Sequence, residues 1–160
     1  MPLRILMVTS GLPHPPTSGA AIRISHFAHH LAERHHLTLL SYGDTGEHES
    51  ANELRAGGMD VVLVPAPSRS GKRTTQMISL LSSRSHLGQI FHSRALDGAL
   101  ESMLASRRND AVLVEGSLLM RHRFPAGTPL VLDEHNLEFE ALQRTANAES
   151  SPVRCERSSR

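Results

Sequence analysis

Four polar residues directly follow a short apolar segment near the end of the chain. Asp133-Glu134-His135-Asn136 comes after Leu130-Val131-Leu132, so two carboxylates, an imidazole and an amide fall where a buried strand would end. Such groups hydrogen-bond sugar hydroxyls and exchange protons, which makes them a candidate functional site. In a simpler interpretation, Asp133 or Asn136 caps the following helix and His135 is a surface side chain. Glu115, after an earlier apolar segment, has the same two interpretations.

A second candidate site lies at the start of a predicted helix. Ser18-Gly19-Ala20 closes a proline-rich loop, Arg23 follows within about one turn, and the first acidic residue of the chain is Glu33. Free N–H groups at a helix start, a glycine that allows close approach and a nearby arginine are suited to binding an anion such as phosphate. An ordinary strand-to-helix loop is the alternative, since the spacing matches neither a dinucleotide fingerprint nor a Walker motif.

The chain contains 11 histidines, which are common metal ligands. His26, His29 and His30 lie close together in the predicted helix, but opposite its apolar positions, so we expect them to face solvent. A zinc site needs further ligands of fixed geometry, which this spacing does not supply. We therefore expect no metal site.

The elements that would position these residues alternate between strands and helices. Apolar runs predict strands at 3–9, 37–42, 61–64, 111–114 and 130–132, and helical spacing predicts helices at 20–35, 49–56, 73–83, about 93–104 and 136–148. Ser18 and Ser93 are the expected N-caps of two of these helices. The alternation predicts an α/β fold, a three-layer Rossmann-like sandwich with a parallel sheet of about five strands. Ligands of such sheets bind outside the carboxyl ends of the strands, where both candidate sites lie.

Length and composition restrict the class of protein. The chain has 160 residues, of which 39% are hydrophobic, 21% charged and 3% aromatic, with a net charge of +1. These values predict one folded domain, residues 1–149, followed by a disordered polar tail, residues 150–160. The few aromatics and the balanced charge argue against a nucleic-acid partner. A single cysteine, no signal peptide and no apolar run of spanning length favour the cytoplasm.

One segment is locally basic although the whole chain is not. Residues 61–96 contain no acidic residue, and Arg69, Lys72, Arg73 and Arg84 lie among apolar side chains there. Such a segment could contact anionic lipid, so residues 69–84 predict a peripheral contact with the inner membrane. A solvated surface segment is the alternative interpretation.

Three ordered motifs together carry a family resemblance. They are Arg4-Ile5-Leu6-Met7-Val8-Thr9-Ser10 with its loop to Ser18-Gly19 and Ile22-Arg23, then His36-Leu37-Thr38-Leu39-Leu40-Ser41, and finally Val131-Leu132-Asp133-Glu134-His135-Asn136. In this order they resemble the N-terminal domain of a family 4 glycosyltransferase of the GT-B fold. More narrowly, the chain is similar to bacterial sugar transferases associated with exopolysaccharide systems. The likeness runs from about residue 3 to about residue 146.

The resemblance implies a function for both candidate sites. It implies the acceptor-side domain of a retaining glycosyltransferase, which uses a nucleotide-sugar as co-substrate and needs no other cofactor. Ser18, Gly19 and Arg23 would contact the donor phosphates, and His135 would be the catalytic contact to the transferred sugar. Contacts to the sugar or the acceptor would come from Glu115, Glu134 and Asn136. The implied acceptor is a glycan or a lipid-linked glycan, in polysaccharide or glycoconjugate biosynthesis.

The chain departs from the family pattern at two places. It has Gly19-Ala20 where the family usually has two glycines, and the family's donor-binding domain has no counterpart after Ala146. We therefore expect the chain to be inactive alone, as a truncated product or as half of a split enzyme with a separate donor-binding partner. An alternative hypothesis is a non-catalytic α/β module that binds a phosphorylated small molecule at Gly19. A metal-dependent hydrolase using Asp133 and His135 would need ligands that the sequence does not identify.

Overall fold

Five strands form one parallel sheet in the computed structural model, which describes residues 1–67, 93–106, 109–124 and 126–134. The strands are β1 (Arg4–Thr9), β2 (His36–Tyr42), β3 (Asp60–Val64), β4 (Ala111–Glu115) and β5 (Leu130–Asp133). Their order across the sheet is β3-β2-β1-β4-β5, and every pairing is parallel. The predicted fold class, a parallel sheet of five strands with flanking helices, is confirmed.

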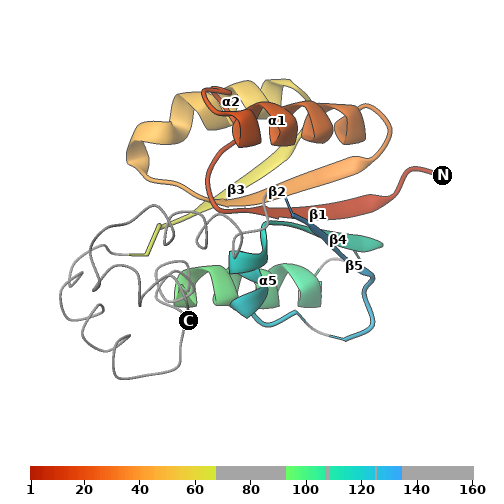
Figure 1. Ribbon diagram of the computed structural model, residues 1–160. Helices are drawn as coiled ribbons and strands as arrows, with labels where there is room; N and C mark the ends of the chain where they lie inside the picture. The colour runs from red at the N-terminus through yellow and green to blue at the C-terminus, as the bar shows by residue number, and fades with distance from the viewer. Residues whose placement is uncertain (68–92, 107–108, 125, 135–160) are drawn as a thin grey trace, which may run out of the picture.

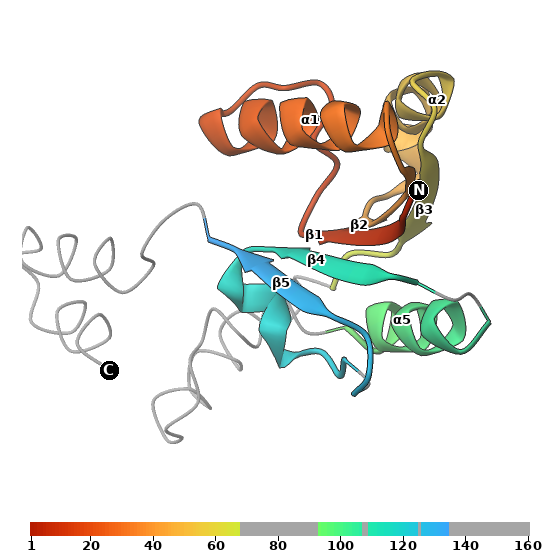
Figure 2. The ribbon, with the colours of Figure 1, turned by 90° about the vertical axis from the view of Figure 1, so that its right-hand side faces the viewer.

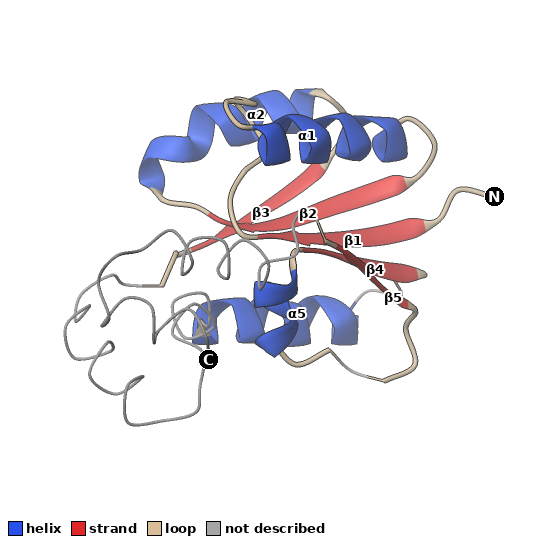
Figure 3. Cartoon of the chain, viewed as in Figure 1, coloured by secondary structure: helices blue, strands red, loops and turns tan. Residues whose placement is uncertain are grey.

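Helices cover both faces of the sheet (Figures 1 and 3). The helical elements are α1 (Gly19–Ala32), the 3-10 turn η1 (Thr45–Glu47), α2 (His48–Ala56), α5 (Arg94–Ser106) and the 3-10 turn η2 (Ser117–Arg121). α1 and α2 lie on one face, and α5 and η2 lie on the other (Figure 1). None of the helices in the described part of the chain has the length and apolar character needed to cross a membrane.

The central strands are buried on both faces, which explains their nearly continuous apolar sequences. Alternate residues enter two cores: Met7 and Leu39 pack with α1 and α2, whereas Leu6 and Leu40 pack with α5. Leu6, Met7, Leu39 and Leu40 are all 0% exposed. A low aromatic content is therefore no obstacle to a core, because aliphatic side chains fill both layers.

The change in strand order occurs beside β1. β1 pairs with β2 on one side and with β4 on the other. The strands up to β3 therefore extend the sheet on one side of β1, and β4 and β5 extend it on the other side. Figure 2 shows β5 at the edge of the sheet away from β3. In open parallel sheets, ligands bind at the carboxyl ends of the strands at such a switch point. The loops that follow β1 and β4 begin there, and Glu134, the residue after β5, lies there as well.

Three local features differ from the sequence-based expectation. The strand at 130–132, expected to be buried, lies at the edge of the sheet, and its apolar residues are 40–52% exposed. α1 ends at Ala32, with Glu33 as its C-cap, rather than continuing to residue 35. Phe27, one of the apolar residues of the helix predicted at 20–35 and so expected in the core, is 39% exposed. It lies one turn after Arg23 on the same side of α1, whereas the neighbouring Ala28 is buried in the core. The predicted helices at 73–83 and 136–148 and the predicted tail at 150–160 lie outside the described residues.

Candidate functional site

The start of α1 carries the first part of the site. Ser18 is the N-cap, as predicted, and its Oγ accepts a hydrogen bond of 3.2 Å from the Ala21 N–H. Within the described part of the chain, no group accepts from the N–H groups of Gly19 and Ala20. The first turn of α1 contains no acidic residue. This helix end therefore presents N–H donors and a positive dipole end without a compensating carboxylate.

Gly19 is exposed at this helix start. A Cβ atom built on it would meet no heavy atom within 4 Å, and its φ is not positive. Neither packing within the described residues nor backbone conformation therefore requires a glycine at this position. The space above the helix end is open to a ligand.

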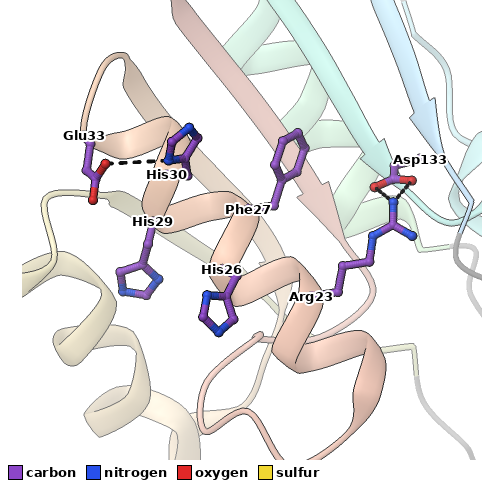
Figure 4. Close-up of a pocket in the computed structure, with 7 residues that line it drawn as sticks. All are labelled: Arg23, His26, Phe27, His29, His30, Glu33 and Asp133. Carbon is purple, nitrogen blue, oxygen red and sulfur yellow. Dashed lines mark hydrogen bonds and ion pairs between the residues drawn. The ribbon is translucent and has the colours of Figure 1, made fainter.

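Arg23 connects the start of α1 to the end of β5. Its Nη2 donates to both carboxylate oxygens of Asp133, at 2.6 and 2.7 Å (Figure 4). No described residue accepts from Nε or Nη1, and the Arg23 side chain is 54% exposed. Asp133 thus fixes the orientation of the guanidinium through one nitrogen and leaves its other donors available to an anion.

Glu115 is the buried carboxyl group of the site. It lies at the end of β4, directly opposite Asp133 in the strand register, and only 3% of the residue is exposed. Burial and, to a lesser extent, the negative charge of Asp133 together raise the pKa of Glu115 to about 7, although the positive charge of Arg23 acts in the opposite direction. A carboxyl group with a pKa near neutrality can give or accept a proton at physiological pH.

The turn after β4 is tied to the end of β5. The Ser117 N–H donates to Oε2 of Glu134 at 2.7 Å, and the Gly116 N–H donates to the Asp133 backbone oxygen at 2.9 Å. Gly116 has a φ of 100°, a conformation that side chains strongly disfavour. These two hydrogen bonds join the C-terminal ends of β4 and β5, where Glu115 and Glu134 lie close together.

The structure brings together most of the residues singled out from sequence. Ser18, Gly19 and Arg23 on α1 and Glu115 and Glu134 on the strand ends share the carboxyl edge of the sheet. His135 and Asn136, as well as the basic segment 69–84, lie outside the described residues. Their roles remain predictions. The link between Arg23 and Asp133 was not predicted, because nothing local in the sequence relates residues 110 positions apart.

A groove of about 590 Å³ runs along α1 beside the Arg23–Asp133 pair. Its lining consists of Arg23, His26, Phe27, His29, His30, Glu33 and Asp133 (Figure 4). The three histidines are exposed, as predicted, and the His29 Nδ1–H donates to the Ser25 carbonyl oxygen at 2.7 Å. Across the described ranges, no group of three or more His, Cys, Asp or Glu side chains could hold a metal ion.

A second polar cluster lies on the other face of the sheet. The buried Tyr42 hydroxyl is 3.1 Å from Nε2 of His122, and Nδ1 of His122 is 2.8 Å from Oδ1 of Asp97. Sequence reasoning missed this cluster, because its members come from β2, from the residue after η2 and from α5.

Comparisons with known proteins give little further information. The sequence matches no protein-family model and no curated protein. Among solved structures, the chain is similar to Arabidopsis thaliana UGT89C1, in its crystal structure complexed with UDP-L-rhamnose, with 18% identity and a TM-score of 0.41. The match covers 74% of this chain and 31% of that one, so the chain spans less than a third of that protein. A TM-score this low identifies neither a shared site nor a shared activity.

Proposed function

We propose that this chain is the acceptor-side domain of a retaining glycosyltransferase. In this proposal it takes part in transferring a sugar from a nucleotide-sugar donor to a glycan or lipid-linked acceptor, in polysaccharide or glycoconjugate biosynthesis. The donor is bound mainly by a second domain across a cleft, as the sequence resemblance implies. The complete active unit therefore contains both domains.

The observation that carries the proposal is the position of the Arg23 guanidinium. Asp133 holds Nη2 of Arg23 at 2.6 and 2.7 Å, one helical turn from the open N–H groups at the start of α1. A donor diphosphate at Gly19 would receive hydrogen bonds from the helix end and from the remaining donors of Arg23. The parallel sheet supports the same location, because its switch point lies beside β1.

The remaining residues are proposed to contact the sugars. Glu115 and Glu134 offer carboxylates beside the phosphate site, suited to sugar or acceptor hydroxyls, and Asn136 would extend this set. His135 is the proposed catalytic contact to the transferred sugar. When the acceptor oxygen bonds to the anomeric carbon, the bond to the donor diphosphate breaks and the acceptor hydroxyl loses its proton. Glu115, with a pKa raised to about 7, is a chemically suitable recipient for that proton.

A second candidate function is a non-catalytic module that binds a phosphorylated small molecule. It is favoured by one observation: the donors at Gly19 and Arg23 suit any phosphate, with or without an attached sugar. The two functions differ in whether the carboxylates at the strand ends contribute to binding.

NMR titration of the ¹⁵N-labelled chain distinguishes these functions. We expect UDP or GDP to shift the amides of Gly19 and Ala20, and the matching nucleotide-sugar to shift the Ser117 amide in addition. Arg23→Gln should weaken binding about tenfold or more, because it removes a charged donor to phosphate. Arg34→Gln, the same charge change at the far end of α1, is the matched control and should bind as the wild type does.

Each alternative outcome has a defined meaning. Nucleotide binding that never involves Ser117 would favour the phosphate-binding module. Equal effects of Arg23→Gln and Arg34→Gln, or shifts confined to other surfaces, would contradict the proposed phosphate site.

A further inference from the structure

The buried cluster of Tyr42, His122 and Asp97, hereafter the polar relay, links three separate elements. Tyr42 ends β2, His122 directly follows η2, and Asp97 lies in the first turn of α5. The His122 side chain is 0% exposed, and Tyr42 is 3% exposed. A buried polar group costs free energy unless it is hydrogen-bonded, so both ring nitrogens of His122 depend on these contacts.

The direction of the two hydrogen bonds follows from the groups involved. Burial, with a smaller effect of the Asp97 charge, raises the pKa of Tyr42, so its hydroxyl keeps its proton at neutral pH. An ionised Asp97 can only accept. A neutral His122 therefore satisfies both partners only when its Nδ1–H donates to Asp97 and its Nε2 accepts from the Tyr42 hydroxyl. The polar relay thus selects one tautomer and one ring orientation.

The polar relay also fixes one end of the η2 turn. The His122 N–H donates to the Leu119 carbonyl oxygen at 3.1 Å, and the Leu119 side chain is 0% exposed in the core beside Tyr42. At the other end of the same turn, Ser117 donates to Glu134 at 2.7 Å. The η2 turn is thus anchored at its C-terminal end by the polar relay and at its N-terminal end by the contact with Glu134 after β5.

We infer that Tyr42, His122 and Asp97 are positioning residues, which hold the η2 turn and through it keep the Ser117 amide in place against Glu134. This inference rests in part on the proposed function, in which Glu134 contacts the sugar or the acceptor and must therefore be held in a fixed position. The hydrogen-bonded chain itself does not depend on that assignment.

NMR measurements on the whole chain test this inference without any ligand. Tyr42→Phe keeps the aromatic ring in the core and removes only the hydroxyl. We expect exchange of the Ser117 amide with solvent to become about tenfold faster, as for the loss of one hydrogen bond. The amide of Leu6, in the central strand, should keep its exchange rate.

Asp97→Asn provides a second variant, and Glu101→Gln its matched control. Both remove one negative charge from α5, but the exposed Glu101 lies outside the polar relay. Long-range ¹⁵N spectra of the wild type should show His122 protonated at Nδ1 and unprotonated at Nε2. Asp97→Asn should reduce that tautomer preference, whereas Glu101→Gln should leave it unchanged.

Two results would overturn the inference. One is equal acceleration of exchange at Ser117 and Leu6, which would mean that the polar relay supports only global stability. The other is an unchanged exchange rate of the Ser117 amide in Tyr42→Phe. Because none of these measurements uses a nucleotide, a failure to bind UDP or GDP would count against the proposed function alone.

Discussion

At the scale of single residues, the two carboxyl groups opposite each other at the ends of β4 and β5 behave differently because their surroundings differ. The Asp133 side chain is 21% exposed and is in contact with the Arg23 guanidinium. Glu115 is 3% exposed and has the negatively charged Asp133 as its neighbour across the strand pair. Burial and like charge both disfavour ionisation of Glu115, which is why its pKa rises to about 7.

This shift makes the stability of the protein depend on pH. The pKa of Glu115 is about 7 in the folded state, against the ordinary glutamate value of 4.5 in the unfolded chain. Between these values the folded state binds more protons, so the contribution of Glu115 to the free energy of unfolding falls as pH rises. Glu115→Gln removes this contribution. Relative to wild type, we expect it to gain at most about 3 kcal/mol in urea unfolding between about pH 4 and about pH 8.

The exposed Glu101 supplies the control for this prediction. Glu101→Gln makes the same chemical change on α5 and should alter the unfolding free energy by a similar small amount at both pH values. A stability difference between Glu115→Gln and wild type that did not change with pH would contradict the buried, proton-binding state of Glu115.

At the scale of elements, the start of α1 combines a structural cap with the proposed phosphate site. The Ser18 hydroxyl accepts from the Ala21 N–H, so the cap uses one of the free donors and leaves those of Gly19 and Ala20. The cap also defines where the helix begins and therefore where its dipole ends. Because Ser18 already caps the helix, a ligand that binds at the start of α1 does not need to order it.

Removing the Ser18 hydroxyl should destabilise the protein, whereas removing the hydroxyl of the neighbouring Thr17 should not. We expect Ser18→Ala to lower the free energy of unfolding by about 1 kcal/mol, measured by urea denaturation. Thr17→Ala, one residue earlier, removes an exposed hydroxyl and should stay within about 0.5 kcal/mol of wild type. Equal losses in the two variants would mean that Ser18 does not act as the cap.

At the scale of the whole molecule, the proposed function requires surfaces from two domains. The described residues supply the proposed phosphate site at the start of α1 and carboxylates at the strand ends, but the resemblance assigns most donor contacts to another domain. Positioning of both substrates provides much of the rate enhancement in group transfer. A single wall of the cleft would bind a donor weakly and would not align it with an acceptor.

We therefore expect the purified 160-residue chain to give no sugar transfer above background. The measurement is release of free nucleotide from UDP- and GDP-sugars with glycan acceptors, with a two-domain glycosyltransferase assayed in parallel as the positive control. Repeated turnover by the isolated chain would contradict the need for a second domain, although it would leave the glycosyltransferase assignment intact.

The sequence by itself determined the order of the elements and the cap at Ser18. These features follow from local patterns, such as apolar runs for buried strands and a hydroxyl before a helix, which neighbouring residues alone decide. The alternation of strands and helices also determined the parallel sheet, because only a limited set of crossovers is compatible with it. Even the location of the candidate site at the carboxyl edge followed from that topology.

Only the tertiary structure decided which side chains meet. The Arg23–Asp133 pair joins residues 110 positions apart, and the contact between Tyr42 and His122 joins residues 80 positions apart. Such contacts depend on which strands lie side by side and on where each turn ends, and no local pattern encodes either. The raised pKa of Glu115 has the same origin, since burial and the opposing Asp133 exist only once β4 and β5 have paired.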